Sequence, residues 1–452
     1  MAIHTRHLRD RWDDVYHMLV DLAWGRFFVP TDMGGNMKAL FKNATIHLDG
    51  TVKRADMSFD CATLSSMGDV SDVAHSLVFD NIVILPGFCD AHVHLREPGF
   101  SYKETIESGT AACAHGGYTA VMTMPNLKPA PDSPENLAVQ LAAIRRGASI
   151  PVFPLGTITV GEMGEELSDM DGLAPDVVGF SDDGRGVQND GMMREAMKRA
   201  KALGLPIVAH CEDNSLLRGG YIHDGEYARA HGHRGICSES EWGQIKRDLE
   251  LVAEIGCAYH VCHVSTKESI ELIREAKRRG LDVTCETAPH YLTLTDANLE
   301  EDGRFKMNPP LRAEEDRLAL IEGIKDGTVD MIATDHAPHS FEEKSRGLEN
   351  SMMGVVGIET AFPVLYTYLV KPGIITMEKL VELLSVNPRK RFGITSDVGY
   401  TVFDLSDRYE IDPNEFLSKG RSTPFAGMTV EGRCLLTAIG EKAVYIDGRL
   451  LG

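Results

Sequence analysis

Between residues 87 and 392, eight short apolar runs alternate with helical stretches, and this alternation limits the fold more than any other feature. The alternation predicts a parallel α/β fold, and eight repeats favour a (β/α)8 TIM barrel. An open doubly wound sheet is the alternative, but it usually carries a Gly-rich dinucleotide turn after its first strand, and none is visible. The expected strands are Gly87–Leu95, Ala120–Met124, Val152–Gly156, Val177–Ser181, Pro206–His210, Ala258–Val264, Asp282–Thr287 and Met331–Thr334.

The two ends of the chain have a different pattern. Residues 37–86 and 393–452 consist of short strand-like runs and turns, so we expect one small β domain built from both ends around the barrel of residues 87–392. Residues 1–36 form an extension of uncertain status. Its apolar residues recur at helical spacing and predict a peripheral helix with no catalytic role: Leu8, Trp12, Val15, Leu19 and Leu22.

Polar residues follow most of the expected barrel strands, at the point where each strand ends. His92 and His94 are two residues apart on an extended segment, so their side chains point to the same side, and Arg96 follows on that side. Active sites of (β/α)8 barrels lie where the carboxyl ends of the strands meet. Further candidates at these ends are Asn126, Asp182, Asp183, His210, His263, Asp335 and His339.

This set of residues has the chemistry of a metal site. His92 and His94 with Asp335 suit one divalent ion, and His210 with His263 suits a second. A carboxylate from Asp182 or Asp183 can bridge the two ions, and the spacing leaves open which. Mixed imidazole and carboxylate ligands favour zinc. Such a pair activates water and polarises a carbonyl, so it predicts hydrolysis or closure of an amide.

Simpler interpretations exist for single residues. His210 next to Glu212 is also compatible with a core histidine, and Asp335-His336 with a helix cap. His290 follows the seventh strand and is either structural or close to the site. The histidines expected to be structural or solvated are His115, His231, His233, His260 and His290.

Composition restricts the partners and the compartment. A formal net charge of −21 argues against nucleic acid or an acidic membrane surface as a partner. Nine cysteines, an odd number without a C-x-x-C pair, indicate reduced thiols in a cytoplasmic protein. No apolar run reaches the length of about 18 residues that a membrane span needs.

From Met37 onward the chain resembles the amidohydrolase superfamily, and within it the bacterial class I dihydroorotases. Five stretches carry the resemblance, and Met-Pro-Asn and Asn-Pro-Pro-Leu-Arg distinguish this family from hydantoinases and allantoinases. The five are Asp-Ala-His-Val-His-Leu-Arg-Glu-Pro-Gly (90–99), Gly-Gly-Tyr-Thr-Ala-Val-Met-Thr-Met-Pro-Asn (116–126), His-Cys-Glu-Asp (210–213), Lys-Met-Asn-Pro-Pro-Leu-Arg (306–312) and Ala-Thr-Asp-His-Ala-Pro-His (333–339).

The resemblance implies reversible interconversion of N-carbamoyl-L-aspartate and L-dihydroorotate, a step of pyrimidine (UMP) synthesis. It implies two Zn2+ per subunit, and it favours Asp183 as the bridge in place of the carbamylated lysine of other superfamily members. Asp335 would act first as general base and then as general acid. The implied zinc ligands are His92, His94, Asp183, His210, His263 and Asp335.

The substrate side and the partners are likewise implied by the resemblance. Arg96, Asn126 and His339 fall where the family binds the substrate carboxylate, and Asn308 falls where it contacts the dihydropyrimidine ring. The family also implies a homodimer and allows association with aspartate transcarbamoylase, whereas nucleic acid and membrane are not expected as partners.

Two departures from the family pattern keep alternatives open. The turn from Phe392 to Gly399 is short, and Ser351-Met352-Met353-Gly354 replaces the more usual Ala-Pro-Phe-Gly in a loop expected near the ring. A hydantoinase or allantoinase is the first rival, although Arg96 disfavours neutral rings. A non-catalytic scaffold for transcarbamoylase is the second rival, although every expected ligand is present.

Overall fold

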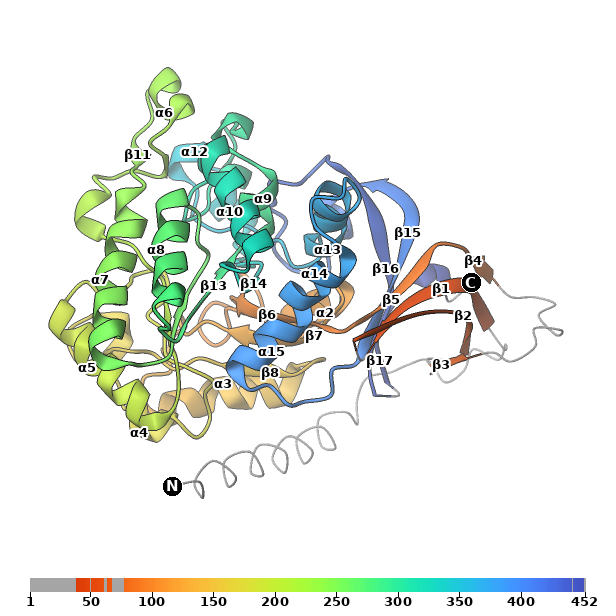
Figure 1. Cartoon of the computed structure of the whole chain (residues 1–452), viewed down its shortest axis with the longest axis horizontal. Helices are drawn as coiled ribbons and strands as arrows, with labels where there is room; N and C mark the ends of the chain where they lie inside the picture. Colours follow the sequence, from red (N-terminus) through yellow and green to blue (C-terminus); the bar gives the residue numbers. More distant parts are fainter. Residues whose placement is uncertain (1–37, 49, 61–62, 67–76, 441, 451–452) are drawn as a thin grey trace.

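A computed structural model of the chain describes residues 38–48, 50–60, 63–66, 77–440 and 442–450. Figure 1 shows a large α/β unit with a β-sheet unit beside it, the latter formed by the first and last described strands. The predicted extension, residues 1–36, lies outside the described residues. Among the described residues, no helix is long and apolar enough to cross a bilayer.

Parallel strands form the centre of the α/β unit. They belong to two ladders, one of three strands and one of four, with the orders β6-β7-β8 and β14-β13-β12-β9. The strands are β6 (Phe88–Val93), β7 (Tyr118–Thr123), β8 (Val152–Pro154), β9 (Ile207–Ala209), β12 (Tyr259–Val261), β13 (Val283–Thr287) and β14 (Met331–Ile332).

Single β-bridges connect the two ladders into a ring. Phe180 bridges in parallel to Gly156, just after β8, and to Ile207 in β9. Val93 at the end of β6 bridges in parallel to His336, just after β14. Each ladder therefore continues into the other, and the first and last parallel segments are neighbours, which an open sheet does not allow. The predicted fourth strand is wrong as a regular strand, because only Phe180 makes bridges there.

Helices follow the parallel strands on the outside of the ring (Figure 1). Thr266 caps the start of α8 by accepting from Ser269 N, and Ile270, Ile273 and Ala276 then face the core at helical spacing. The helices are α2 (Ile106–His115), α3 (Pro134–Gly147), α4 (Met170–Leu173), α5 (Asp190–Leu203), α6 (Glu226–His231), α7 (Glu239–Ile255), α8 (Lys267–Arg278), α9 (Pro289–Thr293), α10 (Glu314–Asp326), α11 (Phe341–Lys344), α12 (Gly347–Asn350), α13 (Ala361–Leu365), α14 (Met377–Val381) and α15 (Asn387–Phe392).

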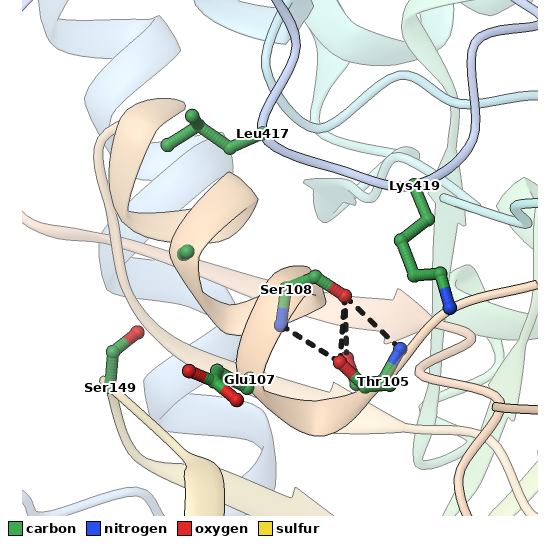
Figure 2. Close-up of a pocket in the computed structure, with 7 residues that line it drawn as sticks. Thr105, Glu107, Ser108, Ser149, Leu417 and Lys419 are labelled. Carbon is green, nitrogen blue, oxygen red and sulfur yellow. Dashed lines mark hydrogen bonds between the residues drawn. The ribbon is translucent and has the colours of Figure 1, made fainter.

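The start of α2 is fixed by a reciprocal capping box. The Thr105 side chain accepts from Ser108 N, and the Ser108 hydroxyl accepts from Thr105 N (Figure 2). Leu417 and Lys419, from a loop near the C-terminus, lie across this helix start and line the same hollow. The loop that leaves β6 is thus anchored to a distant part of the chain.

Both ends of the chain contribute to one eight-stranded sheet, as predicted. Its order is β17-β16-β15-β5-β1-β2-β3, with β4 pairing with β1. Strand β5 joins the two ends, because it pairs in parallel with β1 and antiparallel with β15. The strands are β1 (Lys38–Leu48), β2 (Thr51–Asp60), β3 (Thr63–Ser66), β4 (Leu77–Phe79), β5 (Ile82–Pro86), β15 (Tyr400–Glu410), β16 (Thr429–Ile439) and β17 (Lys442–Ile446).

Two further two-residue strands, β10 (Ile222–His223) and β11 (Gly235–Ile236), pair with each other in the loop that carries α6. The eight cysteines among the described residues are free thiols, and seven of them are buried. This agrees with the expectation that they behave as small apolar side chains.

Candidate metal centre

Six polar side chains meet at the carboxyl ends of the parallel strands. They come from five parallel segments of the ring, His92 and His94 from the same one, so the order of the strands brings them together, although they are up to 243 residues apart in the sequence. They are the six residues predicted as metal ligands: His92, His94, Asp183, His210, His263 and Asp335.

His92, His94 and Asp335 form one half of the cluster. Asp335 Oδ1 lies 3.1 Å from His94 Nε2 and 3.6 Å from His92 Nε2. Together the three offer one ligand atom each within 4.8 Å of one another. Two imidazoles and one carboxylate are the ligands that a catalytic zinc ion commonly takes from protein, with a further position left open.

His210 and His263 form the other half. His210 Nδ1 lies 2.9 Å from His263 Nε2, and each of these nitrogens lies 3.7 Å from Asp183 Oδ1. Asp183 also reaches the first half, with Oδ1 3.4 Å from His92 Nε2 and Oδ2 3.5 Å from His94 Nε2. The Asp183 carboxylate therefore lies between the two halves, where a bridging ligand would be placed.

The burial of these groups requires a compensating charge. All six residues are at most 7% exposed. Three atoms at the centre have no hydrogen-bond partner, namely His92 Nε2, Asp183 Oδ1 and His210 Nε2. Buried polar atoms without partners are costly, and convergent nitrogen lone pairs and carboxylate oxygens repel one another. The donor set therefore fits divalent cations.

The structure distinguishes the two neighbouring aspartates. Asp182 turns away from the cluster, and its Oδ1 accepts from the backbone of Ile158 at 2.8 Å and of Thr159 at 3.0 Å. It orders the loop after β8. Asp183 faces the histidines, and although burial opposes ionisation, the nearby His92 and His263 hold its pKa well below the usual range.

Asp335 is also ionised. Burial alone would raise its pKa, but the hydrogen bond from His94 and the charge of His92 lower it. A carboxylate at this position can accept a proton from a neighbouring group. Its backbone, like that of Arg96 and His263, has a positive φ, and these three are among seven such non-glycine residues in the described chain. Backbone strain of this kind persists mainly at functional sites.

Glu286, which the sequence analysis did not identify, supports the cluster from inside the ring. Its Oε1 lies 2.7 Å from His92 Nδ1, and its Oε2 lies 3.2 Å from His260 Nε2. A carboxylate at Nδ1 fixes the proton there and leaves the Nε2 lone pair of His92 free for a cation. A charged residue inside the otherwise uncharged strand β13 was the available signal.

The predicted substrate-binding residues form two groups. Arg96 Nη2 lies 3.4 Å from His339 Nε2, and Arg96 Nε donates to Pro338 O at 3.1 Å, so these two residues belong to one site. Asn126 instead contacts the metal cluster, with Oδ1 2.9 Å from His94 Nδ1 and Nδ2 3.4 Å from Asp183 Oδ2. It lies between the cluster and the mouth.

Asn308 contacts the other half of the cluster through Glu212. Its Nδ2 donates to Glu212 Oε1 at 2.9 Å, and Glu212 Oε2 lies 3.6 Å from His210 Nε2. Glu212 was considered only as a neighbour of His210, yet it connects the ring-contact residue to the metal cluster. Its pKa is lowered, because the hydrogen bonds and charge of His210 outweigh burial.

Of the histidines expected to be structural, His115, His231 and His233 have partners away from the six ligands, whereas His260 and His290 lie next to the cluster. His115 pairs with Glu359, and His231 and His233 pack around Tyr227. His260 is buried and contacts Glu286, so it lies one step behind His92. His290 packs on Tyr291, and burial lowers its pKa to about 4, so it is a neutral imidazole.

Comparisons with known proteins agree with this geometry. A family profile described as "Dihydro-orotase-like" matches residues 81–269. The chain is 48% identical over 419 residues to a dihydroorotase of Bacillus caldolyticus, covering 89% of this chain and 97% of that protein. It is 47% identical over 418 residues to a dihydroorotase of Fusobacterium nucleatum, covering 90% and 98%.

Solved structures share the fold. An L-hydantoinase (dihydropyrimidinase) from Arthrobacter aurescens superimposes with a TM-score of 0.76 at 26% identity, covering 91% of this chain and 96% of that one. A dihydropyrimidinase from Brevibacillus agri gives 0.74 at 23% identity, covering 91% and 95%. At the latter identity the likeness concerns the fold alone.

Proposed function

Because this chain belongs to the dihydroorotase family of cyclic amidohydrolases, we propose that it interconverts L-dihydroorotate and N-carbamoyl-L-aspartate with two zinc ions. One observation carries the proposal: a buried arginine–histidine pair, Arg96 and His339, lies beside a six-residue metal cluster. A hydrolytic centre next to a fixed cation suits a cyclic amide that carries a carboxylate. The ring of parallel segments supports the predicted (β/α)8 barrel, with its site at the carboxyl ends of the strands.

In this proposal His92, His94 and Asp335 would hold one ion, His210 and His263 would hold the other, and Asp183 would be shared between them. When bound, a zinc pair supplies an activated water and a Lewis acid for the ring carbonyl. The convergence of unpartnered buried atoms at this point supports the assignment.

Asp335 moves the proton. Water attacks the ring carbonyl carbon next to the amide NH and the carbon–nitrogen bond breaks. The products are a carboxylate, the terminal NH2 of the carbamoyl group and one proton released to solvent. The ionised Asp335 accepts the proton that the attacking water loses and delivers it to the leaving nitrogen. In the direction of ring closure the same carboxylate takes the proton from that nitrogen.

Arg96 and His339 bind the carboxylate of the substrate. Arg96 is 8% exposed, and Pro338 O fixes its Nε, which orients the terminal nitrogens of the guanidinium. A planar guanidinium can bind a carboxylate through two parallel hydrogen bonds. Asn126 binds the same carboxylate and Asn308 contacts the ring, and the two amides are held in place by the carboxylates of Asp183 and Glu212.

We further propose a cytoplasmic homodimer that can associate with aspartate transcarbamoylase. The reduced cysteines support the compartment, while the family resemblance supports both associations. Light scattering of the purified chain, alone and mixed with the transcarbamoylase of the same organism, tests the two associations separately. A single monomeric species in both experiments contradicts them.

The test of the activity is a side-by-side assay of the zinc-loaded protein on dihydroorotate, hydantoin and allantoin. Dihydroorotate should be the preferred substrate, and elemental analysis should give two zinc ions per chain. A preference for hydantoin or allantoin would overturn the substrate assignment. A folded protein that binds no metal would indicate the non-catalytic scaffold instead.

A further inference from the structure

His339 has four polar contacts, and they favour different protonation states of its two ring nitrogens. Its Nε2 lies 2.7 Å from Met353 O and 3.4 Å from Arg96 Nη2. Its Nδ1 lies 3.2 Å from Lys103 Nζ and 3.4 Å from Glu343 Oε2. The ring is 6% exposed, so water cannot hydrogen-bond to a ring nitrogen whose protein partner does not match its protonation.

Only one protonation state satisfies the two shortest contacts. A carbonyl oxygen can only accept, so the contact with Met353 requires a proton on Nε2. A lysine ammonium can only donate, so the contact with Lys103 requires a lone pair on Nδ1. The neutral Nε2–H tautomer meets both demands. A doubly protonated ring would add a cation beside Lys103 and Arg96; burial and these two charges lower its pKa to about 3.

Glu343 would favour a proton on Nδ1 of His339, but it does not compete for that proton while Lys103 is present. Its carboxylate is already paired with the lysine, with Lys103 Nζ 3.1 Å from Oε1. Lys103 is 7% exposed and lies in the loop after β6, which Glu104 anchors through its hydrogen bond from Ser418. The ammonium therefore stands at a fixed place behind the imidazole.

The acceptor on the other side of the ring is fixed as well. Lys344 Nζ donates to Met352 O at 2.8 Å and to Gly354 O at 2.7 Å, the two carbonyls that flank Met353. It also donates to Lys306 O at 3.0 Å, two residues before Asn308. The Met353 carbonyl thus marks a defined direction in which the Nε2 proton points.

We propose that Lys103 is a positioning residue that, together with the Met353 carbonyl, holds His339 in its Nε2–H tautomer, so that a substrate carboxylate beside Arg96 meets the edge of the imidazole that carries the proton and not a lone pair. The part of this inference that concerns substrate rests on the proposed function. Without Lys103, the Glu343 carboxylate would accept a hydrogen bond from an Nδ1–H group and so compete with the Met353 carbonyl for the proton of the imidazole. The Nε2 lone pair would then face the substrate carboxylate and repel it.

The first test reads the tautomer directly and needs no activity. Nitrogen-15 NMR of histidine-labelled protein, with the His339 signal assigned by its loss in His339→Asn, should show Nε2–H in the wild type and in Lys103→Arg. Lys103→Met should shift the ring toward the Nδ1–H tautomer, relative to the wild type. A wild type with Nδ1–H or with a doubly protonated ring overturns the proposal, even if no variant folds. Absence of dihydroorotase activity would refute the function without affecting this result.

The second test measures binding of substrate. Lys103→Met should raise KM for dihydroorotate by about 10- to 100-fold, the loss expected for one hydrogen bond to a charged group, with a much smaller change in kcat. Lys103→Met/Glu343→Gln, which removes the acceptor at Nδ1, should recover part of that loss. A raised KM with the Nε2–H signal unchanged overturns the proposal, as does a KM equal to that of the wild type.

Lys419→Met is the matched control. Lys419 lies near the same loop, where its Nζ donates to Ser101 O at 2.5 Å, but it is exposed and belongs to the hollow at the start of α2 (Figure 2). Its loss removes a lysine that contacts the loop after β6 without touching the partners of His339. KM and the tautomer should both stay at the wild-type values. A rise in KM equal to that of Lys103→Met would contradict the role of the tautomer.

Discussion

The two sides of the active-site mouth are built differently. The six residues of the metal cluster come from the ends of parallel segments of the ring, and their carboxylate and imidazole partners are also buried there. Arg96 and His339 depend on loops, because Pro338, Met353 and Lys103 hold them. The proposed metal ligands thus stand at the ends of the parallel segments, and the proposed substrate-binding pair is held by loops, the kind of segment that tolerates sequence change.

We call the six proposed ligands the metal side of the mouth, and Arg96 and His339 with the loops that hold them the loop side. Single substitutions on the metal side should mainly lower kcat, and those on the loop side should mainly raise KM. Asp335→Asn should lower kcat by about 10²- to 10⁴-fold, the usual contribution of a general acid–base group, while most of the metal remains. Steady-state kinetics with metal analysis checks this. Asp248→Asn is the control, because Asp248 is equally buried but bonds Tyr259 outside the site. Near wild-type turnover with metal present would contradict the assignment of Asp335.

Glu286→Gln should weaken metal binding by about 10- to 100-fold, because the amide no longer fixes the Nδ1 proton of His92 with a full charge. Competition with a chelator measures this affinity. Glu359→Gln is the matched control, since it removes the same carboxylate–imidazole contact, to His115, at a site away from the ligands. Equal metal affinity in Glu286→Gln and Glu359→Gln would show that the contact with His92 plays no part.

The metal ligands could be predicted from the sequence more completely than the loop-held residues. Period-two alternation and strand ends located His92, His94, His210 and His263, because strand order alone brings such positions together. Spacing could not tell whether Asp182 or Asp183 faces the histidines, because the two are neighbours in a loop. The structure distinguishes them because Asp182 accepts hydrogen bonds from the backbone of Ile158 and Thr159 and so turns away from the cluster. The fold was predicted in the same way, apart from the fourth segment, where only Phe180 pairs.

The loop side was less accessible to prediction. Arg96 and His339 were identified, but Lys103 and the Met353 carbonyl act on His339 from parts of the chain that no local pattern connects to it. Asn126 contacts His94 and Asp183, two contacts that the sequence did not predict for it. Side-chain direction after the end of a strand depends on loop packing, which single-sequence patterns do not contain.

Gly354 offers the smallest and most local test of the loop side. Its φ is +126°, and an added Cβ would lie 2.8 Å from Ala337 O and 3.0 Å from His339 Nε2. Gly354→Ala should therefore destabilise the fold by about 1–3 kcal/mol and raise KM several-fold with little change in kcat. Gly373→Ala is the control, because φ is also positive there, at +76°, but a Cβ meets nothing within 4 Å.

Thermal unfolding and steady-state kinetics on both glycine variants separate the two effects. Gly373→Ala should show a loss of stability from the backbone alone and an unchanged KM. If Gly354→Ala also left KM unchanged, the loop of residues 351–354 would not position His339.

The most direct test of the account is the preference for dihydroorotate over dihydrouracil, the same ring without the carboxylate, in the wild type and in Arg96→Met. The account predicts a strong preference of the wild type for dihydroorotate. Arg96→Met should reduce that preference by at least about 30-fold, because it removes a buried charge pair worth roughly 2–5 kcal/mol, while kcat/KM for dihydrouracil changes little. Equal kcat/KM for the two rings in the wild type, or a preference that survives in Arg96→Met, would contradict the claim that Arg96 selects the substrate.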